Sequence, residues 1–192
     1  MGASTRQRLI STAQAFFYTH GFHAVGLDRI LSDVGVTKTT FYNHFESKDD
    51  LIVAVLKEQD VQETARYLRE IEDRAPGDPR GQILAMFDLL EEWFADSEFR
   101  GCMFINAAAA FPALNDPIHR VASEHNAHLF ECVRQLAEQA GAEDPGELAD
   151  KIMVVLTGSI VTRHASLNAG AASIARRTVE MLLEHFLPPV PV

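Results

Sequence analysis

Residues 27–48 constrain the fold of this chain more than any other segment, because they predict two short helices joined by a glycine turn. Apolar side chains of the first helix recur at helical spacing, at Leu27, Ile30, Leu31 and Val34. Gly35 supplies the positive φ that ends this helix. A second helix starts at Thr37, whose hydroxyl can cap the exposed backbone N–H groups. Two helices at an angle therefore follow from local signals alone.

The second helix has an apolar face and a polar face. Phe41 and Phe45 lie four residues apart and anchor one face in a core. The side chains of the other face carry hydrogen-bonding groups suited to phosphates or base edges: Thr37, Lys38, Thr39, Thr40, Tyr42, Asn43 and His44. The turn alone fits an ordinary helical hairpin with a solvated face equally well. The donor-rich strip favours a helix-turn-helix whose second helix enters the major groove of DNA.

Three segments of the chain resemble the tetracycline-repressor (TetR) family of bacterial regulators. Residues 37–51, TKTTFYNHFESKDDL, resemble its recognition helix and the start of its fourth helix. Residues 15–22 are similar to the end of its first helix, and residues 101–111, GCMFINAAAAF, to a sixth-helix segment of some members. The resemblance implies phosphate contacts from Tyr42, His44 and Lys48. It implies base or near-base contacts from four residues: Thr37, Lys38, Thr39 and Thr40.

Composition agrees with a globular DNA-binding protein. Of the 192 residues, 47% are hydrophobic and 23% are charged, which is ordinary for a soluble chain. The net charge is −10, but residues 1–45 carry a small basic excess and the remainder carries the acid. This asymmetry leaves a positive edge for DNA. No signal peptide and no run of about 18 apolar residues is present, so we expect a cytoplasmic protein without a membrane partner.

The helical pattern along the chain predicts an all-α protein of about nine helices. Residues 1–46 are expected to form a three-helix helix-turn-helix DNA-binding domain. Residues 47–74 are expected to form a connecting helix, which the Pro/Gly cluster at residues 75–79 ends. Residues 75–192 are expected to form a helical ligand-binding and dimerisation domain.

The resemblance also implies an apolar cavity for a small effector in the second domain. Aromatic and apolar residues with few polar groups are typical of such pockets. The expected lining residues are Phe87, Leu90, Phe94, Met103, Phe104, Asn106, Phe111 and His125. The same aromatic side chains can instead fill a core. His125 interrupts an apolar stripe, either as a hydrogen-bonded core histidine or as a polar group for the ligand.

Other chemistry receives less support from the sequence. Cys102 is a candidate redox or electrophile sensor if a helix N-terminus lowers the pKa of its thiol, although inert buried thiols are commoner. His125 and His128 lack further ligands, so neither a metal site nor a cofactor is predicted. A helical enzyme using Cys102, Cys132 and His125 is disfavoured, because no nucleophile, base and orienting carboxylate form a set.

The last two helices are expected to form a dimer interface. The helix around residues 148–161 is apolar nearly all round, which a small domain cannot bury alone; the alternative is a deep intrachain core. The expected interface residues are Ile152, Val155, Leu156, Ser159, Ile174, Leu182 and Phe186. Two helices from each subunit would form a four-helix interface and present two recognition helices to a palindromic operator. The sequence thus predicts a ligand-responsive homodimeric regulator, most simply a repressor released by a small apolar or aromatic effector.

Overall fold

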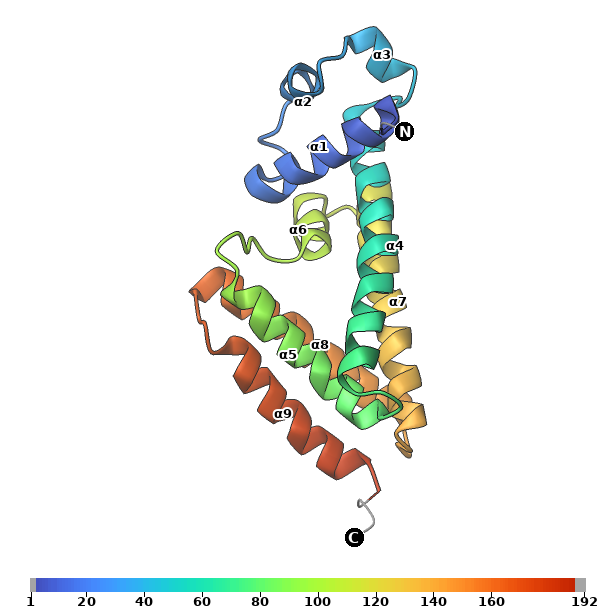
Figure 1. The fold of residues 1–192 in the computed structure, drawn as a ribbon, viewed down its shortest axis with the longest axis vertical. Coiled ribbons are helices and arrows are strands. Elements are labelled where there is room, and N and C mark those ends of the chain that lie inside the picture. The colour runs from blue at the N-terminus through green and yellow to red at the C-terminus, as the bar shows by residue number, and fades with distance from the viewer. Residues whose placement is uncertain (1–2, 189–192) are drawn as a thin grey trace. The chain divides into compact units, whose positions relative to one another are not determined.

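The computed structural model describes residues 3–188 and is helical throughout (Figure 1). Over the described residues nine α-helices follow one another without a strand: α1 (Thr5–His20), α2 (Leu27–Val34), α3 (Lys38–Tyr42), α4 (Lys48–Arg74), α5 (Pro79–Ala95), α6 (Met103–Ala110), α7 (Pro117–Gln139), α8 (Pro145–Ser166) and α9 (Ala171–Phe186). This confirms the predicted all-α class. None of these helices within residues 3–188 combines the length and apolarity needed to cross a bilayer.

The turn between α2 and α3 forms as the local sequence predicts. Gly35 adopts a left-handed conformation, with φ 72° and ψ 42°, and its N–H donates to the Leu31 carbonyl at 2.9 Å. Thr37 is the N-cap of α3, and its hydroxyl accepts a hydrogen bond from the Thr40 N–H at 3.2 Å. These two residues fix where α2 ends and α3 begins.

The chain divides into two compact units. One comprises Met1–Gln62 and Cys102–His125, and the other comprises Glu63–Gly101 and Asn126–Val192. Two of the three boundaries fall inside α4 and inside α7, so both helices belong to two units, and the third falls between α5 and α6. This division differs from the three segments expected from the sequence, 1–46, 47–74 and 75–192. Residues 102–125 group with the N-terminal helices because their apolar side chains share one core with them.

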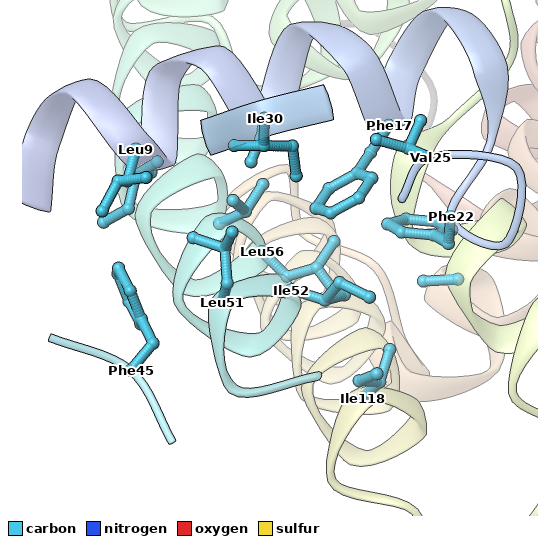
Figure 2. Packing of buried hydrophobic residues seen from close by; sticks show 14 of the residues in the cluster. Leu9, Phe17, Phe22, Val25, Ile30, Phe45, Leu51, Ile52, Leu56 and Ile118 are labelled. Atoms are coloured by element: carbon cyan, nitrogen blue, oxygen red, sulfur yellow. The ribbon is translucent and has the colours of Figure 1, made fainter. Parts of the chain in front are cut away.

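The core of the first unit runs continuously from α1 to the start of α7 (Figure 2). Phe17 of α1, Ile30 of α2 and Ile52 of α4 are almost completely buried in it. Phe41 of α3 and Phe104 of α6 are buried to the same degree. Removing such side chains from water is the main favourable term in folding, at about 1.5–3 kcal/mol for each large side chain.

In the second unit, α9 packs against both α5 and α8 (Figure 1). An arginine joins α8 to the end of α5: the Nε and Nη2 atoms of Arg163 donate hydrogen bonds to the Phe94 carbonyl at 3.1 and 3.0 Å. The same guanidinium lies 5.1 Å from the centre of the Phe99 ring. The cation therefore satisfies a helix-end carbonyl and contacts an aromatic face at once.

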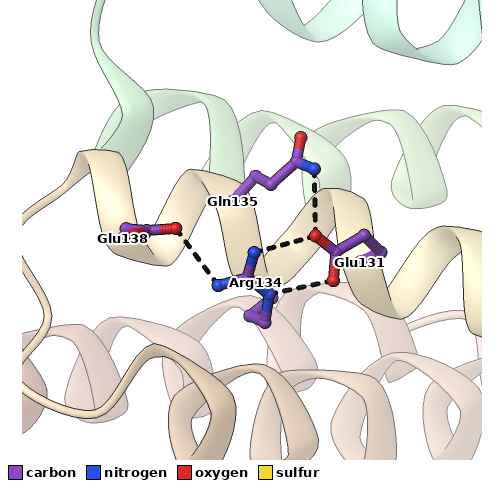
Figure 3. Close-up of polar contacts among 4 residues, drawn as sticks. All are labelled: Glu131, Arg134, Gln135 and Glu138. Atoms are coloured by element: carbon purple, nitrogen blue, oxygen red, sulfur yellow. Dashed lines mark hydrogen bonds and ion pairs between the residues drawn. The ribbon is translucent and has the colours of Figure 1, made fainter.

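An ion-pair network lies along α7 in the second unit (Figure 3). Arg134 donates two hydrogen bonds to the Glu131 carboxylate, at 2.8 and 2.9 Å, and one to Glu138 at 3.1 Å. Gln135 donates to Glu131 at 3.0 Å. The bonds from Arg134, followed by the bond from Gln135, lower the pKa of Glu131 to about 2.

Gly35→Ala tests the left-handed turn. The added Cβ meets no neighbouring atom of the described residues, so the cost comes from the backbone conformation alone. We expect the free energy of unfolding to fall by about 1–2 kcal/mol, measured by urea denaturation. Gly35→Asn is the matched control and should lose less, because asparagine adopts this conformation more readily. An alanine variant as stable as the parent chain would contradict the assigned turn.

Arg134→Gln tests the network on α7. Without the guanidinium, the pKa of Glu131 should rise from about 2 towards its ordinary value of 4.5, measured by NMR titration of the side-chain carboxyl. Because the folded-state pKa is depressed, the stabilising contribution is present above the ordinary pKa and is lost as pH falls towards 2. Lys151→Gln, which breaks a separate pair with Glu147 on α8, should leave Glu131 unchanged. Equal titration of Glu131 in the parent and in Arg134→Gln would refute the assignment.

Candidate nucleic-acid interface

The segment from Thr37 to Phe45 presents polar side chains to solvent and buries its two phenylalanines. Phe41 and Phe45 are in the core, with ring centres 5.5 Å apart. The predicted contact residues that are exposed are Thr37, Lys38, Thr39, Tyr42, Asn43 and His44. Thr40 is half-buried, and its hydroxyl lies 3.0 Å from that of Thr37. One short segment therefore displays hydroxyl, amide, imidazole and ammonium groups together on a rigid base.

Tyr42 is the most prominent aromatic side chain of this surface. Its ring meets the Phe41 ring edge-on, with centres 5.3 Å apart and planes at 78°, yet the residue remains 58% exposed. An exposed tyrosine held by a buried phenylalanine keeps a fixed place without losing its hydroxyl to an internal partner. It is therefore suited to contact an external group.

The start of α4 is organised differently from the sequence-based expectation of an open phosphate site at Lys48. The Lys48 ammonium donates to the Phe22 carbonyl at 2.6 Å, and the side chain is half-buried. The Ser47 hydroxyl accepts from the Asp50 N–H at 3.0 Å, and the Asp50 carboxylate accepts from the Glu46 N–H at 3.1 Å. The chain's own side chains thus cap this helix start, and Asp50 places negative charge there.

Each lysine and arginine within the described residues 3–48 is engaged by another group of the chain. The pairs are Arg6 with the Phe45 ring, Arg8 with the Val34 carbonyl, Arg29 with the Phe16 ring, Lys38 with Asp28, and Lys48 with the Phe22 carbonyl. Among them Lys38 is held by a carboxylate, at 2.9 Å. The hydrogen bond to Asp28, with the charge of that residue, raises the pKa of Lys38. No sequence pattern pointed to Asp28 as the partner of Lys38, because a separation of ten residues matches no helical spacing.

The residues expected to line an effector cavity are divided between the two units. Phe87, Leu90 and Phe94 are buried on α5 in the second unit. The remainder lie in the first unit: Met103, Phe104, Asn106, Phe111 and His125. Met103 and Phe104 belong to the core shared with the N-terminal helices. Neither unit by itself therefore brings the whole expected set together.

Phe111 has structural partners inside the first unit. The Phe111 ring lies 4.9 Å from the His23 ring and 5.9 Å from the Phe22 ring, centre to centre. His23 donates through Nε2 to the Ala110 carbonyl at 3.0 Å. The end of α6 is thereby joined to the corner between α1 and α2.

His125 is hydrogen-bonded in the first unit. Its Nδ1 lies 2.7 Å from the Asp60 Oδ1, and its ring stacks on Phe104 with centres 3.6 Å apart and planes at 7°. This pair explains a histidine in an apolar stripe, as the core-histidine interpretation expects. Asp60 lies 65 residues earlier, in a charged stretch of α4, so no local signal identified it.

A groove in the second unit lies between α7 and α8. It is lined by Asn126, Ala127, Phe130, Asp150, Met153, Val154 and Thr157, with a volume of about 520 Å³. None of the expected effector residues is among these.

The two cysteines are in different units and neither forms a disulfide: Cys102 is the N-cap residue of α6, and Cys132 lies on α7. Both are half-buried, and sensing by Cys102 stays a prediction.

The expected dimer residues do not share one exposed face. Ile152, Leu156 and Ser159 are buried within the chain itself, so their side chains are already covered and cannot meet a partner. Val155, Leu182 and Phe186 are half-buried, and Ile174 is 50% exposed. The outward apolar side chains of α8 and α9 are Val154, Val161, Ile174 and Met181. The sequence did not separate the two faces of α8 because that helix is apolar nearly all round.

Comparisons with known proteins show which proteins share this sequence pattern and architecture. A family model described as bacterial regulatory proteins, tetR family, matches residues 9–55, which run from α1 into α4. The curated regulator YjdC of Escherichia coli K12 is 24% identical over 102 residues, which make up 53% of this chain and 53% of that protein. The match thus spans about half the length of this curated relative.

Two solved structures match almost the whole chain. One is SCO4454, a TetR-family transcriptional regulator from Streptomyces coelicolor, with 30% identity, coverage of 95% of each chain and a TM-score of 0.86. The other is sav143, a TetR-type regulator from Streptomyces avermitilis MA-4680, with 30% identity, coverage of 96% and 98%, and a TM-score of 0.84. Together with the family model for α1 to α4, these matches show that the chain belongs to the TetR family of bacterial transcriptional regulators.

Proposed function

We propose that this chain binds duplex DNA through α3, acts as a homodimer on a palindromic operator, and represses transcription until a small apolar or aromatic effector releases it. One observation carries the DNA-binding part. The segment from Thr37 to His44 exposes a dense set of polar groups above the buried Phe41 and Phe45, inside the stretch that matches the family model. Base edges and phosphates offer the complementary hydrogen-bonding groups.

Within this proposal, the residues of α3 take different roles. Thr37, Lys38, Thr39 and Thr40 lie at the start of the helix, the part that approaches base edges in helix-turn-helix proteins. Tyr42, Asn43 and His44 follow at its end and are suited to phosphates. Lys48 holds the start of α4 against the Phe22 carbonyl. Because an ammonium has three N–H donors, this bond leaves others for a phosphate.

The dimer proposal rests on an exposed face formed by two helices that pack together, α8 and α9. Val154, Gly158 and Val161 follow one another at helical spacing on α8 and are exposed. Ile174 and Met181 are exposed seven residues apart on α9. A second copy of the same face would cover these side chains symmetrically. Gly158 would allow a helix to approach closely, because even an added Cβ there would meet open space within the described part of the chain.

The effector proposal rests on the apolar face of α5 and on family membership. Phe87, Leu90 and Phe94 supply buried apolar surface in the second unit. The rings of Trp93 and Phe99 pack edge-on against each other, with their centres 4.8 Å apart. Release requires that the effector and DNA prefer different conformations of the dimer. A coupling free energy of about 1–3 kcal/mol is sufficient, and DNA must then weaken effector binding by the same factor.

Selection of bound fragments from a random duplex library tests the DNA-binding proposal directly. The full chain, without effector, should enrich an inverted repeat whose half-sites lie about one helical turn apart. Placing that repeat across a reporter promoter then separates repression from activation. Failure to retain any duplex at low salt would overturn the proposal, because non-specific electrostatic binding is strongest under those conditions.

Thr39→Ala tests base recognition. The exposed hydroxyl is available for a base edge, so its loss should weaken binding to the selected operator by about 1–3 kcal/mol and leave unrelated duplex nearly unaffected. Fluorescence anisotropy titrations with both duplexes measure the two affinities. Thr19→Ala, an exposed threonine of α1 whose hydroxyl donates to the Ala15 carbonyl, is the control and should change neither affinity. Equal losses in both threonine variants would exclude a specific contact from Thr39.

Met181→Glu tests the dimer face. Met181 is 70% exposed in the single chain, so the substitution should be tolerated in the fold but should place a charge inside the interface. We expect a monomer by sedimentation velocity, with operator affinity reduced because two half-sites are no longer bound together. Leu114→Glu is the control, since Leu114 is 79% exposed between α6 and α7, outside this face. A dimer that survives Met181→Glu as well as Leu114→Glu would rule out this face.

A further inference from the structure

Lys38 at the start of α3 and Asp28 at the start of α2 form an ion pair. The Lys38 ammonium lies 2.9 Å from one oxygen of the Asp28 carboxylate, and both side chains are well exposed, at 63% and 78%. Asp28 is in the first turn of α2, where a negative charge is favourable to the helix. Lys38 is the first residue of α3. A carboxylate therefore stands beside a cation at the proposed DNA-reading surface.

We propose that Asp28 is a specificity-determining residue, which directs Lys38 towards base edges and withholds it from DNA phosphates. This inference rests on the proposed DNA-binding function. An ammonium has three N–H donors, and one of them donates to an oxygen of the Asp28 carboxylate. Lys38 can thus keep its bond to Asp28 while donating to guanine O6 or N7 in the major groove.

A phosphate contact, in contrast, requires Lys38 to separate from Asp28. If Lys38 turns to the backbone, it leaves the Asp28 carboxylate beside the phosphates, where like charges repel. Binding to unrelated DNA depends almost wholly on phosphate contacts, so it bears this penalty in full. Binding to an operator that meets Lys38 at a base edge does not bear this penalty, because the bond between Lys38 and Asp28 is kept. The exposed pair is weak enough to be broken by DNA, but it shifts the balance between the two kinds of contact.

The other cations near α3 cannot replace Lys38 in this role. Arg8 is bonded to the Val34 carbonyl, and Arg29 lies 4.6 Å from the centre of the Phe16 ring and 3.0 Å from the His20 Nε2. Lys48 is half-buried on the Phe22 carbonyl. Among the lysines and arginines of residues 3–48, Lys38 is thus the one that a carboxylate holds.

Asp28→Asn tests the inference, with Asp33→Asn as the matched control. Asp33 is exposed on the same helix, and its replacement changes the net charge equally without removing the partner of Lys38. Anisotropy titrations with the selected operator and with unrelated duplex, each at several salt concentrations, give both affinities and their salt dependence. For Asp28→Asn we expect binding to unrelated duplex to strengthen about two- to fivefold per subunit. The salt slope should steepen by about one per subunit, and operator affinity should not rise in proportion.

The same substitution in a Lys38→Met background isolates the pair. Without the ammonium, Asp28→Asn frees no cation for a phosphate, so it should no longer steepen the salt slope, and its effect on binding to unrelated duplex should be smaller than in the parent chain. The inference is overturned if the two asparagine variants of the parent chain show the same affinity for unrelated duplex and the same salt slope. If the parent chain binds no duplex at all, the proposed function itself fails and this inference with it. If the parent selects an operator and Asp28→Asn matches its control, only this inference fails.

Discussion

The proposed DNA-reading surface depends on a core that is assembled from distant parts of the sequence. A helix of five residues, such as α3, is not stable by itself in water, because nucleating a helix costs more than so few hydrogen bonds return. Burial of Phe41 and Phe45 holds it in place. The same core includes Phe104 from α6 and Ile118 from α7, more than 50 residues away along the chain. The surface is rigid because tertiary packing, rather than helix propensity, stabilises it.

This shared core also fixes the corner between α1 and α2 within the first unit. α6 and the first part of α7 pack with the N-terminal helices, and the corner between α1 and α2 is fastened on two sides. On one side His23 and Phe111 join it to the end of α6, and on the other Lys48 joins it to the start of α4. A change in the position of α6 therefore bears on the same corner as a change in α4.

The features that sequence could predict are those with local causes. The glycine turn, the threonine cap and the spacing of Phe41 and Phe45 depend on residues within five positions of one another, and the structure confirms them. The partners of His125, Lys48 and Lys38 depend on how helices meet in three dimensions, so no spacing identified them. The buried and exposed faces of α8 were also indistinguishable in sequence, because apolar residues occur on both. The packing of α8 against α9 separates them.

The overall negative charge of the chain has a kinetic consequence. Fast association with nucleic acid relies on a positive field that reaches beyond the surface and draws the protein towards the duplex. Here the net charge is −10, and residues 1–45 hold only a small basic excess, although the arginines that lie against rings and a carbonyl keep their charge. Such a molecule has little long-range attraction for DNA. Its search for a binding site would proceed by repeated brief collisions rather than by long one-dimensional sliding along the duplex.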